Sequence, residues 1–386
     1  MENRRLARPV LTVNQISQIT LMVKHAAHDA GFELAGVAPV RDFDELKYFS
    51  DWIEAGHAGE MKYMEARDEA GQLKRASLRS SVPWARSVIV CAINYNTPRP
   101  YSTQVDDSDR GWISRYAWSR EDYHDAVMRR LRSVENVLRD TVRQGQDALA
   151  TADEAPALQT RCYVDTGPLV ERVYAKYAGV GWIGKNTCIL NQKLGSWLFL
   201  GVILTSLELQ PDLHAPDRCG SCTRCIEACP TDALIAPYQL DSNKCISYLT
   251  IEKRGAIPQD LREGLGRHVF GCDICQDVCP WNRKSPETSA AEFQARDGFV
   301  NPALEWLADM SAEEFRERFR ASPIRRTKRS GLRRNAAIAM GNSGNQKFLT
   351  TLQKLTADDD AVVAESARWA VEKLNGSTST PTPGTK

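Results

Sequence analysis

The residues best suited to chemistry are four cysteines in the stretch CGSCTRCIEACP, residues 219–230. They are Cys219, Cys222, Cys225 and Cys229, and a proline follows the last of them. In this spacing three thiolates bind one metal centre from a single loop, while the fourth lies on the next helical turn and points away. We therefore expect a metal centre here, and a second one to which the fourth cysteine belongs.

A second run of cysteines supplies that other site. Cys272, Cys275 and Cys279, again followed by proline, repeat the last three positions of the first run, and Val269 stands where the first cysteine would be. The spacing C-x2-C-x2-C-x3-C-P is that of bacterial ferredoxins, which hold two 4Fe-4S clusters. Cys245, between the two runs, is the best candidate for the missing ligand.

The two runs are expected to exchange one ligand each. Cluster one is then bound by Cys219, Cys222, Cys225 and Cys279. Cluster two is bound by Cys229, Cys245, Cys272 and Cys275. The alternative is a pair of structural zinc sites, because C-x2-C pairs also suit zinc, but zinc motifs do not need the x3-Cys-Pro spacing twice. The other cysteines lie in apolar, strand-like stretches and are expected to be core residues: Cys91, Cys162 and Cys188.

Length and composition are those of an ordinary globular chain. Its 386 residues suggest two or three domains, with 42% hydrophobic and 26% charged residues. The 50 basic and 49 acidic residues give a net charge of +1, so a nucleic-acid partner would need a local basic patch. No apolar run is long enough for a membrane span or a signal peptide, which predicts a cytoplasmic protein with no membrane partner. In that compartment clustered cysteines bind metal more often than they form disulfides.

The elements before the cysteine runs alternate between helix and strand. Residues 14–30 place apolar side chains at helical spacing, and residues 87–95 and 161–168 are apolar runs of strand length. Between these runs a long helix is expected, with Ser119 as its N-cap. Its apolar face is predicted to consist of Val127, Leu131, Val134 and Leu138.

Residues 1–212 are predicted to form one mixed α/β domain. A further helix should begin at Pro168 and end at Gly179, and residues 187–191 and 196–205 should pair as strands around the turn QKLG. Strands interleaved with helices in this way are typical of a mixed α/β fold.

Two further domains and a tail are expected after that. Residues 213–285 form the cysteine module. Residues 286–375 are predicted to be helical, with a weak repeat of about thirty residues like that of stacked HEAT helix pairs. The tail GSTSTPTPGTK, residues 376–386, is rich in Ser, Thr and Pro and is expected to be disordered.

Two short motifs in the first domain do not carry their usual functions. GVGWIG, residues 179–184, fits a dinucleotide fingerprint, but it follows a helix and leads into a strand, which is the reverse of that motif's context. Gly181 and Gly184 are expected to permit close approach of the backbone to a bulky group, with a plain structural turn as the alternative. DTG, residues 165–167, lacks the second copy that an aspartic protease needs.

Asp165 is nevertheless a candidate functional residue. It ends a predicted strand, so its carboxylate should lie at the carboxyl edge of the sheet, where α/β proteins place ligands. Partial burial would raise its pKa and let it carry a proton near neutral pH. From local sequence alone, capping the helix that begins at Pro168 is the better interpretation.

Four longer stretches resemble one known family. RYAWSREDYH, VDTGPLVERVYAKYAGVGWIGKNTCILN, CISYLTIEKRGAIP and GCDICQDVCPWNR, together with the cysteine runs and in this order, are similar to epoxyqueuosine reductases over most of residues 15–375. The resemblance implies a cobalamin-dependent enzyme with two 4Fe-4S clusters that reduces the epoxide of epoxyqueuosine, at the wobble position of tRNA, to queuosine. Electrons would pass from an external donor through the clusters to cobalamin.

The resemblance also implies a fold and site residues. It implies a nitroreductase-like α/β domain that holds cobalamin beside a ferredoxin-like cluster module, as in reductive dehalogenases. Asp165 matches the aspartate that protonates the departing oxygen, which favours catalysis over helix capping. Ser119 departs from the family, where glycine is expected. The cobalamin neighbourhood carried over from the family consists of Tyr116, Ala117, Asp165, Lys185, Asn186, Ile189 and Ser247.

A tRNA substrate would require a basic surface. PIRRTKRSGLRRNAA, residues 323–337, is strongly basic, and Arg333 and Arg334 complete the run. Such a run is usually a solvated face, but with a polyanionic substrate phosphate contact is the better interpretation. Tyr248 and Trp281 are candidates for stacking on the extruded base. The expected tRNA contacts are Lys253, Arg254, Arg325, Arg326, Lys328 and Arg329.

Three other classes of protein fit part of the pattern. A simple ferredoxin would need neither the α/β domain nor the basic helical region. A reductive dehalogenase acting on a small molecule shares the cofactors, but that family usually carries a twin-arginine export signal, and the N-terminal MENRRLARPV does not qualify. A zinc-dependent tRNA-binding protein would contain no iron. We expect a monomeric epoxyqueuosine reductase.

Overall fold

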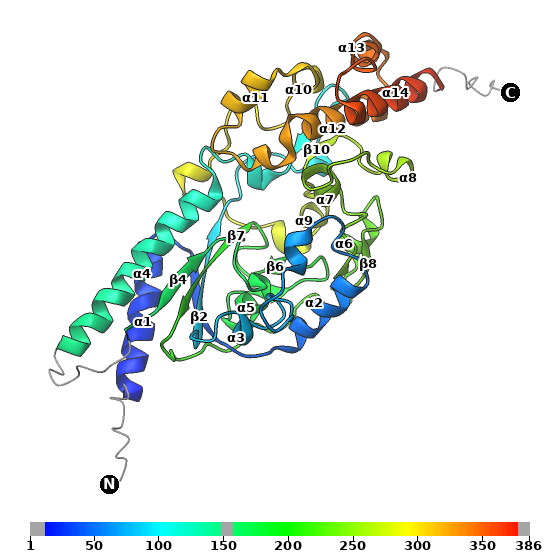
Figure 1. Cartoon of the computed structure of the whole chain (residues 1–386). Helices are drawn as coiled ribbons and strands as arrows, with labels where there is room; N and C mark the ends of the chain where they lie inside the picture. Colours follow the sequence, from blue (N-terminus) through cyan, green and yellow to red (C-terminus); the bar gives the residue numbers. More distant parts are fainter. Residues whose placement is uncertain (1–11, 148–156, 377–386) are drawn as a thin grey trace, which may run out of the picture.

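The computed structural model describes residues 12–147 and 157–376 of the chain. Figure 1 shows a lower body built around a β-sheet and an upper group of helices from residues 304–376. This arrangement confirms the prediction of a mixed α/β fold. No helix within the two described ranges is long and apolar enough to cross a bilayer. Apart from Gly376, the predicted disordered tail lies outside the described residues.

Four strands form the central sheet, in the order β1 (Leu34–Pro39), β2 (Ser87–Asn94), β7 (Leu198–Thr205) and β4 (Thr160–Tyr163). Each neighbouring pair is antiparallel. β2 is buried along its whole length because each of its faces packs into a separate core. Ile89, Cys91 and Ile93 belong to one core, and Val88, Val90 and Ala92 belong to the other. The strand predicted at residues 87–95 is confirmed, whereas of the run predicted at 161–168 only residues 161–163 belong to a strand, because the chain bends from Val164.

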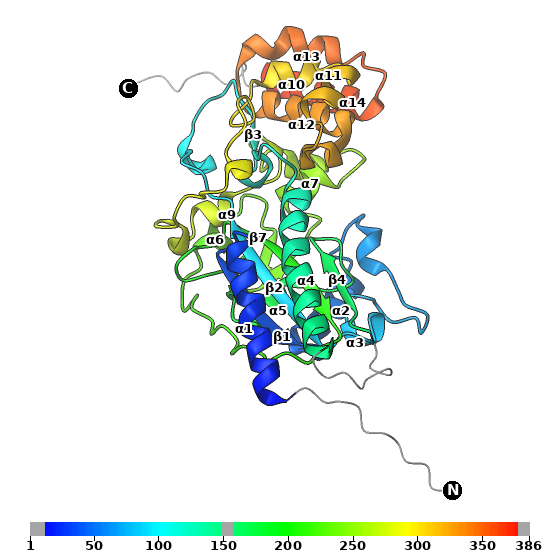
Figure 2. The ribbon, with the colours of Figure 1, turned by 90° about the vertical axis from the view of Figure 1, so that its left-hand side faces the viewer.

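Two helices cover one face of the sheet, α1 (Val13–Asp29) and α4 (Tyr123–Asp147). Figure 2 shows them side by side in front of β2 and β7. α4 begins at Tyr123, and the carboxylate of Asp122 accepts the N–H of His124 at 3.0 Å. The prediction of Ser119 as N-cap is wrong, because Ser119 is buried in a bridge to Ala295. The predicted apolar face of α4 is confirmed, with all four side chains fully buried.

The other face carries α5 (Glu171–Tyr177), which starts three residues later than predicted. Pro168 lies in the preceding turn, while Gly179 ends the helix with φ 71°, as expected. The predicted hairpin of residues 187–205 is wrong. β6 (Ile189–Leu190) pairs instead with β5 (Trp182–Ile183), because β7 is central and has both edges taken by β2 and β4.

The glycines of GVGWIG serve this small hairpin. A Cβ on Gly181 would lie 2.4 Å from the carbonyl oxygen of Leu190, and a Cβ on Gly184 would lie 2.5 Å from Leu190 Cδ1. The close approach is therefore to the neighbouring strand. These contacts favour the alternative of a plain structural turn, and the approach of a bulky group to these glycines stays a prediction.

The cysteine segment is built of short elements that are tied to the rest of the chain. β10 (His268–Phe270) pairs in parallel with β3 (Trp112–Ile113), so the segment joins a strand from the first half of the chain. The remaining elements are α6 (Arg224–Glu227), β8 (Leu234–Ala236), β9 (Gln239–Leu240), α7 (Ile246–Ile251), α8 (Gln259–Arg262) and α9 (Ile274–Asp277).

The upper helices pack around a buried central helix, α12 (Lys328–Asn342). A Cβ on Gly341 would meet the Cβ of Ala370 at 2.8 Å, so this glycine permits the close packing of α12 and α14. Trp112 and Trp118 share the core of these helices. The other helices of the group are α10 (Leu304–Asp309), α11 (Ala312–Arg318), α13 (Leu349–Leu355) and α14 (Ala361–Gly376).

Short elements connect these layers. Two further α-helices lie between β1 and β2: α2 (Asp44–Glu54) and α3 (Leu78–Ser81). The 3-10 helices are η1 (Lys62–Glu65), η2 (Ser102–Gln104), η3 (Arg115–Ala117), η4 (Pro280–Asn282), η5 (Ala291–Phe293), η6 (Pro323–Thr327) and η7 (Gln346–Phe348).

Candidate active site

Asp165 occupies the turn that follows β4. Its side chain is exposed, and its φ of 61° is in the left-handed region, which costs a non-glycine residue about 1 kcal/mol or more. The carboxylate accepts a hydrogen bond from the hydroxyl of Tyr123 at 3.1 Å, and the backbone N–H donates to Glu171 Oε1 at 2.8 Å. Val170 is the N-cap of α5, so the interpretation of Asp165 as a helix cap is wrong.

Two tyrosines form one side of the site. Tyr123 is buried, and burial, followed by the charge of Asp165, holds its pKa well above the usual range. The ring of Tyr116 meets that of Tyr123 edge-on at 5.9 Å, and burial raises the pKa of Tyr116 as well. Both hydroxyls therefore stay protonated in the physiological range, and the hydroxyl of Tyr123 is a permanent donor to Asp165.

Glu171 provides a second carboxyl group beside Asp165. Burial raises its pKa to about 8, and the charge of Asp165 adds to the rise. Glu171 therefore carries a proton at neutral pH while one of its oxygens holds the backbone of the Asp165 turn. The sequence did not single out this residue. A glutamate in the first turn of a helix is common, because its charge interacts favourably with the helix dipole.

Tyr63 and two arginines lie near the two carboxyl groups, Tyr63 and Arg326 near Asp165 and Arg75 near Glu171. The ring of Tyr63 is 43% exposed, and the guanidinium carbons of Arg326 and Arg75 lie 5.6 and 5.9 Å from its centroid. Arg326 also pairs with Glu252 at 2.6 Å and donates to the Tyr63 hydroxyl at 3.3 Å. Burial, and then the charges of Glu252 and Asp165 among others, raise the pKa of Tyr63. No local pattern in the sequence singles out Tyr63.

The structure places Cys279 with the first cysteine run. Burial raises the pKa of Cys279 to about 11, and the next contributions to the rise come from Cys219 and Cys225. The loop of the first run is held by Lys185, whose ammonium donates to the carbonyls of Gly220 at 2.7 Å and Cys222 at 3.0 Å. Four thiols from two distant stretches thus gather on one side of the module.

Cys229 lies instead with the other thiols. Burial, followed by the charge of Cys245, raises the pKa of Cys272. Burial also raises the pKa of Cys245, and the charge of Cys229 adds to the rise at both Cys272 and Cys245. Cys275 is half-buried beside Cys272. Across the described ranges, no three Cys, His, Asp or Glu side chains converge on a point that one metal ion would fill. A 4Fe-4S cluster takes one thiolate at each iron corner and needs no such convergence.

Cys188 is not the simple core residue that was predicted. Its thiol lies beside that of Cys275, and the interaction with Cys275 lowers the pKa of Cys188 to about 7. Asn186 braces the pair, since its Nδ2 donates to the Cys275 carbonyl at 3.2 Å and its Oδ1 accepts the Cys188 N–H at 3.2 Å. Cys91 and Cys162 do belong to the core of the sheet.

The second group of thiols is tied to the tyrosine side of the site. Asp273, beside Cys272, is buried and accepts hydrogen bonds from Trp112 Nε1 at 3.0 Å and from the Arg115 N–H at 2.8 Å. A Cβ on the adjacent Gly271 would lie 3.6 Å from the ring of Tyr116. Cluster two would thus lie near Tyr116 and Asp165.

The residues carried over for cobalamin are divided among several places. Tyr116 lies at the site with Asp165, and Ser247 is half-buried on α7 near Cys245. Lys185 and Asn186 hold the cysteine loops, as described above. Ala117 and Ile189 are buried in two different cores. These assignments remain predictions.

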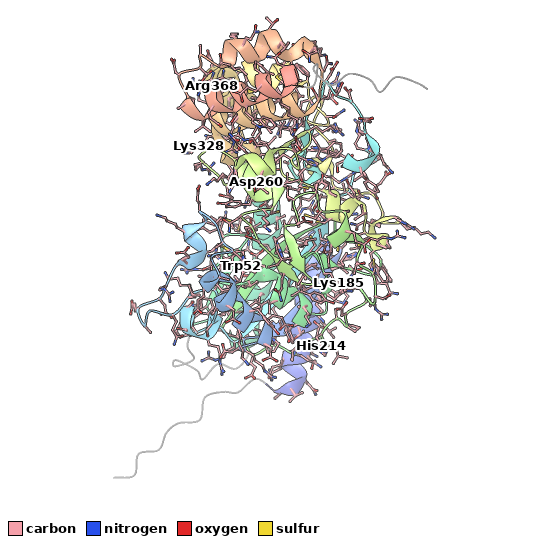
Figure 3. All side chains as sticks on the ribbon, turned by 90° about the vertical axis from the view of Figure 1, so that its right-hand side faces the viewer. Trp52, Lys185, His214, Asp260, Lys328 and Arg368 are labelled. Atoms are coloured by element: carbon pink, nitrogen blue, oxygen red, sulfur yellow. The ribbon has the colours of Figure 1, made fainter. Side chains whose placement is uncertain are left out.

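The basic run of residues 323–337 is only partly a surface. Arg325, Arg326 and Lys328 are exposed, and Figure 3 shows Lys328 at the lower edge of the upper helices, away from Lys185. Arg333 is buried and pairs with Asp358 at 2.6 Å. Arg334 is fully buried, and burial lowers its pKa to about 10. The inclusion of Arg333 and Arg334 in a surface patch is therefore wrong.

The remaining tRNA candidates differ in exposure. Arg254 is exposed and donates to the carbonyl of Arg326 at 2.8 Å, whereas Lys253 is half-buried and pairs with Glu60. Arg329 is half-buried, with its Nε donating to the Met310 carbonyl at 2.7 Å.

Neither predicted stacking residue faces Asp165. Tyr248 is buried, and its hydroxyl accepts the Glu60 N–H at 2.7 Å. Trp281 meets Trp182 edge-on at 5.1 Å, next to Cys219 and Cys279. The exposed aromatic ring near Asp165 is that of Tyr63.

The mixed α/β fold and two groups of four thiols define a two-cluster iron–sulfur oxidoreductase. A family model described as "4Fe-4S double cluster binding domain" matches residues 218–282, and one described as "Epoxyqueuosine reductase QueG, DUF1730" matches residues 75–166. The epoxyqueuosine reductase of Synechocystis sp. is 42% identical over 306 residues, which are 78% of this chain and 98% of that protein. The protein of that name from Xanthomonas campestris pv. campestris is 36% identical over 90% of this chain and 94% of its own.

A solved structure gives the same result. The crystal structure of epoxyqueuosine reductase with an epoxyqueuosine-modified tRNA-Tyr stem loop has a TM-score of 0.80 and 30% identity, covering 93% of this chain and 91% of that chain. The chain belongs to the epoxyqueuosine reductase family. It is accordingly an oxidoreductase with two 4Fe-4S clusters and cobalamin, as the sequence predicted, and the small-molecule dehalogenase alternative is not favoured.

Proposed function

We propose that this protein reduces epoxyqueuosine at the wobble position of tRNA to queuosine, in the cytoplasm and as a monomer, with Asp165 as the proton donor. The observation that carries the proposal is the pairing of Asp165 with Tyr123 and Glu171 at an open site, next to the second group of thiols. The reaction takes two electrons and two protons, converts the epoxide to an alkene and releases water.

Cobalamin fits the side chains around this site. A corrin offers a broad flat ring with an amide rim, and the exposed ring of Tyr63, the half-buried Tyr116 and the guanidinium groups of Arg75 and Arg326 offer flat faces and donors. When bound, cobalamin would supply a strongly reducing, nucleophilic cobalt centre. The residues that would hold it are Tyr116, Ala117, Asp165, Lys185, Asn186, Ile189 and Ser247, as the family resemblance implies.

The chain's own groups manage the protons. Tyr123 orients the carboxyl group of Asp165 through its hydroxyl, and Glu171 fixes the Asp165 backbone. Asp165 protonates the departing oxygen, and Glu171, with a pKa of about 8, is the proton source beside it. The exposure of Asp165 leaves its carboxyl group accessible to a bound nucleoside.

The eight thiols divide between the clusters in the crossed pattern. The contribution of Cys219 and Cys225 to the raised pKa of Cys279, and of Cys229 to that of Cys272, supports it. The proposed ligands of cluster one are Cys219, Cys222, Cys225 and Cys279. Those of cluster two are Cys229, Cys245, Cys272 and Cys275.

We propose one domain for each of three tasks: binding cobalamin, binding the clusters and binding tRNA. Residues 1–212 form a nitroreductase-like cobalamin domain, 213–285 a ferredoxin-like module and 286–375 a HEAT-like tRNA-binding region, followed by the tail 376–386. The pairing of β3 with β10 fixes the first two against each other.

The substrate tRNA is proposed to lie along the exposed cations beside Tyr63. Arg254, Arg325, Arg326 and Lys328 are exposed there, and Arg326 contacts Tyr63 directly. Lys253 and Arg329 complete the proposed contacts. A relative in this family was crystallised with an epoxyqueuosine-modified stem loop, which supports the same substrate for this chain.

The test is turnover of modified tRNA by the anaerobically reconstituted protein, followed by mass spectrometry of the nucleosides. The wild type should convert epoxyqueuosine to queuosine. Asp165→Asn should keep its iron, its cobalamin and its affinity for tRNA but lose at least a hundredfold in kcat, because the proton donor is gone. Wild-type kcat in this variant would remove Asp165 from the reaction.

A further inference from the structure

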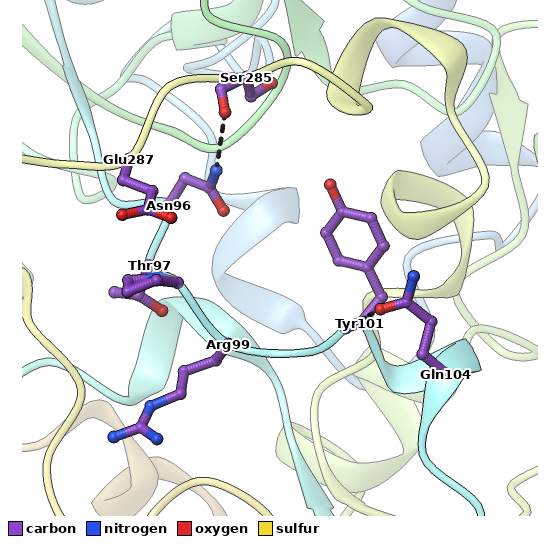
Figure 4. Close-up of a pocket in the computed structure, with 8 residues that line it drawn as sticks. Asn96, Thr97, Arg99, Tyr101, Gln104, Ser285 and Glu287 are labelled. Carbon is purple, nitrogen blue, oxygen red and sulfur yellow. Dashed lines mark hydrogen bonds between the residues drawn. The ribbon is translucent and has the colours of Figure 1, made fainter.

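Two adjoining hollows open on the surface beside the first cysteine run. One, of about 530 Å³, is lined by Arg224 and Arg283 among others, and its neighbour, of about 400 Å³, by Arg99. Tyr101 and Gln104 line both hollows, so the two adjoin, and together we call them the cluster-side groove. Figure 4 shows Tyr101 and Arg99 along its second part. Nothing in the proposed reaction uses this groove.

The rim of the cluster-side groove is basic. The cations that line it are Arg99, Arg224 and Arg283, and Lys284 lies between two lining residues in the sequence. All four are exposed, and none forms an ion pair with a carboxylate in the part of the chain that the structure describes. The carboxylates that line it are Glu227, Asp277 and Glu287. Asp277 is buried and accepts hydrogen bonds from Ser102, and Glu227 accepts one from the hydroxyl of Thr223.

The groove adjoins the proposed ligands of cluster one and not Asp165. In the sequence Arg224 lies between Cys222 and Cys225. Arg283 follows Cys279 by four residues. A Cβ on Gly220, at the tip of the ligand loop, would meet no atom within 4 Å, so the tip faces solvent. The second thiol group lies with Tyr116 instead. Electrons from outside would therefore reach cluster one first.

We propose that the cluster-side groove is the docking site of a small acidic one-electron carrier protein of the ferredoxin class. The unpaired cations complement an acidic partner and would speed its diffusional encounter, as is usual for transient electron-transfer complexes. Each docked carrier gives up one electron, oxidising its own cluster and reducing cluster one by one electron. Two such encounters supply the two electrons of one turnover. The inference rests on the proposed function only in requiring electrons from outside.

The test measures reduction of the clusters without tRNA, so it is independent of the nucleoside chemistry. A reduced plant-type 2Fe-2S ferredoxin, an acidic carrier, is mixed anaerobically with the reconstituted protein, and the loss of cluster absorbance is followed. In Arg224→Glu/Arg283→Glu the second-order rate constant should fall at least tenfold and lose most of its salt dependence. Reduction by dithionite should stay within twofold of the wild type.

A matched control reverses two exposed arginines elsewhere. Arg41→Glu/Arg132→Glu should react with ferredoxin like the wild type, since neither arginine is near the groove or ion-paired within the described residues. Should the reversal variant lose iron, Arg224→Gln/Arg283→Gln decides instead, with a smaller drop in the same direction. An unchanged ferredoxin rate overturns the proposal, as does an equal loss with dithionite. Weakened tRNA binding with an unchanged ferredoxin rate would make the groove a nucleic-acid surface and also overturn it.

Discussion

At the scale of single residues, the site depends on two carboxyl groups in different environments. Asp165 is exposed and bonded by Tyr123, whereas the pKa of Glu171 is raised to about 8, chiefly by burial. Pairs of this kind divide the work of acid and base. Glu171 binds its proton more tightly in the folded than in the unfolded protein. It therefore favours the unfolded state increasingly as the pH rises from the ordinary glutamate range toward 8.

Glu171→Gln tests this role. The amide oxygen can still accept the Asp165 N–H, but the group no longer holds a proton that it can release. We expect kcat to fall about tenfold or more with unchanged affinity for tRNA, and the decline of Tm between pH 5 and pH 8 to become shallower. Steady-state kinetics and thermal melts across this pH range measure both effects.

Glu33 offers a matched control for that variant. Burial raises its pKa too, and its carboxylate accepts the N–H of Asn94 at 3.0 Å, but it lies against β2 and not at the site. Glu33→Gln should flatten the pH dependence of Tm and leave kcat unchanged. An identical kcat in the wild type and Glu171→Gln would contradict the role of Glu171 as a proton source.

At the scale of elements, one buried arginine joins the upper helices to the cysteine segment. Arg334 of α12 donates to the carbonyls of Leu249, Lys253 and Gly255 at 2.7–2.8 Å, around the end of α7. Arg334→Met should destabilise the protein by about 3 kcal/mol, because three carbonyls, one buried and two partly buried, lose their donor. Denaturant unfolding of the reconstituted protein measures this change. Arg325→Met, at an exposed position, should change stability by less than about 0.5 kcal/mol. Equal stabilities of the two variants would contradict the bracing role.

The same helix shows where sequence reasoning fails. Charge composition treated Arg325 and Arg334 alike, because a basic run does not reveal that α10, α14 and α7 surround α12. Long-range pairing also explains why the predicted hairpin of residues 187–205 is wrong. β7 pairs with β2 and β4, and not with β6, its neighbour in the sequence. Tyr63 was missed for the same reason: it lies beside Arg326 only in the fold.

What the sequence did predict was local or motif-based. Apolar spacing identified α1 and the buried face of α4, because burial on one side imposes a 3.6-residue period. The cysteine spacing and the longer motifs identified the family, because cluster ligation tolerates little change in spacing. Asp165 was singled out by its place after a strand, but its partners Tyr123 and Glu171 emerged only from the structure.

At the scale of the whole molecule, a net charge of +1 hides two separate basic surfaces. One borders the cluster-side groove, and the other follows the lower edge of the upper helices beside Tyr63. If they serve an acidic carrier and tRNA respectively, charge reversal at one surface should leave the partner of the other unaffected. Electron supply and substrate binding could then proceed at the same time on one molecule.

Arg325→Glu/Lys328→Glu tests the second surface. Both side chains are exposed, and neither makes an ion pair within the described parts of the chain. We expect weaker binding of all cognate tRNAs and a salt slope lowered by about 2, because each reversed cation no longer neutralises a phosphate. Filter binding at several salt concentrations measures both, and Arg41→Glu/Arg132→Glu is again the control. Ferredoxin-driven reduction of the clusters should be unchanged in this variant, whereas a parallel loss of both functions would show that the two surfaces act as one.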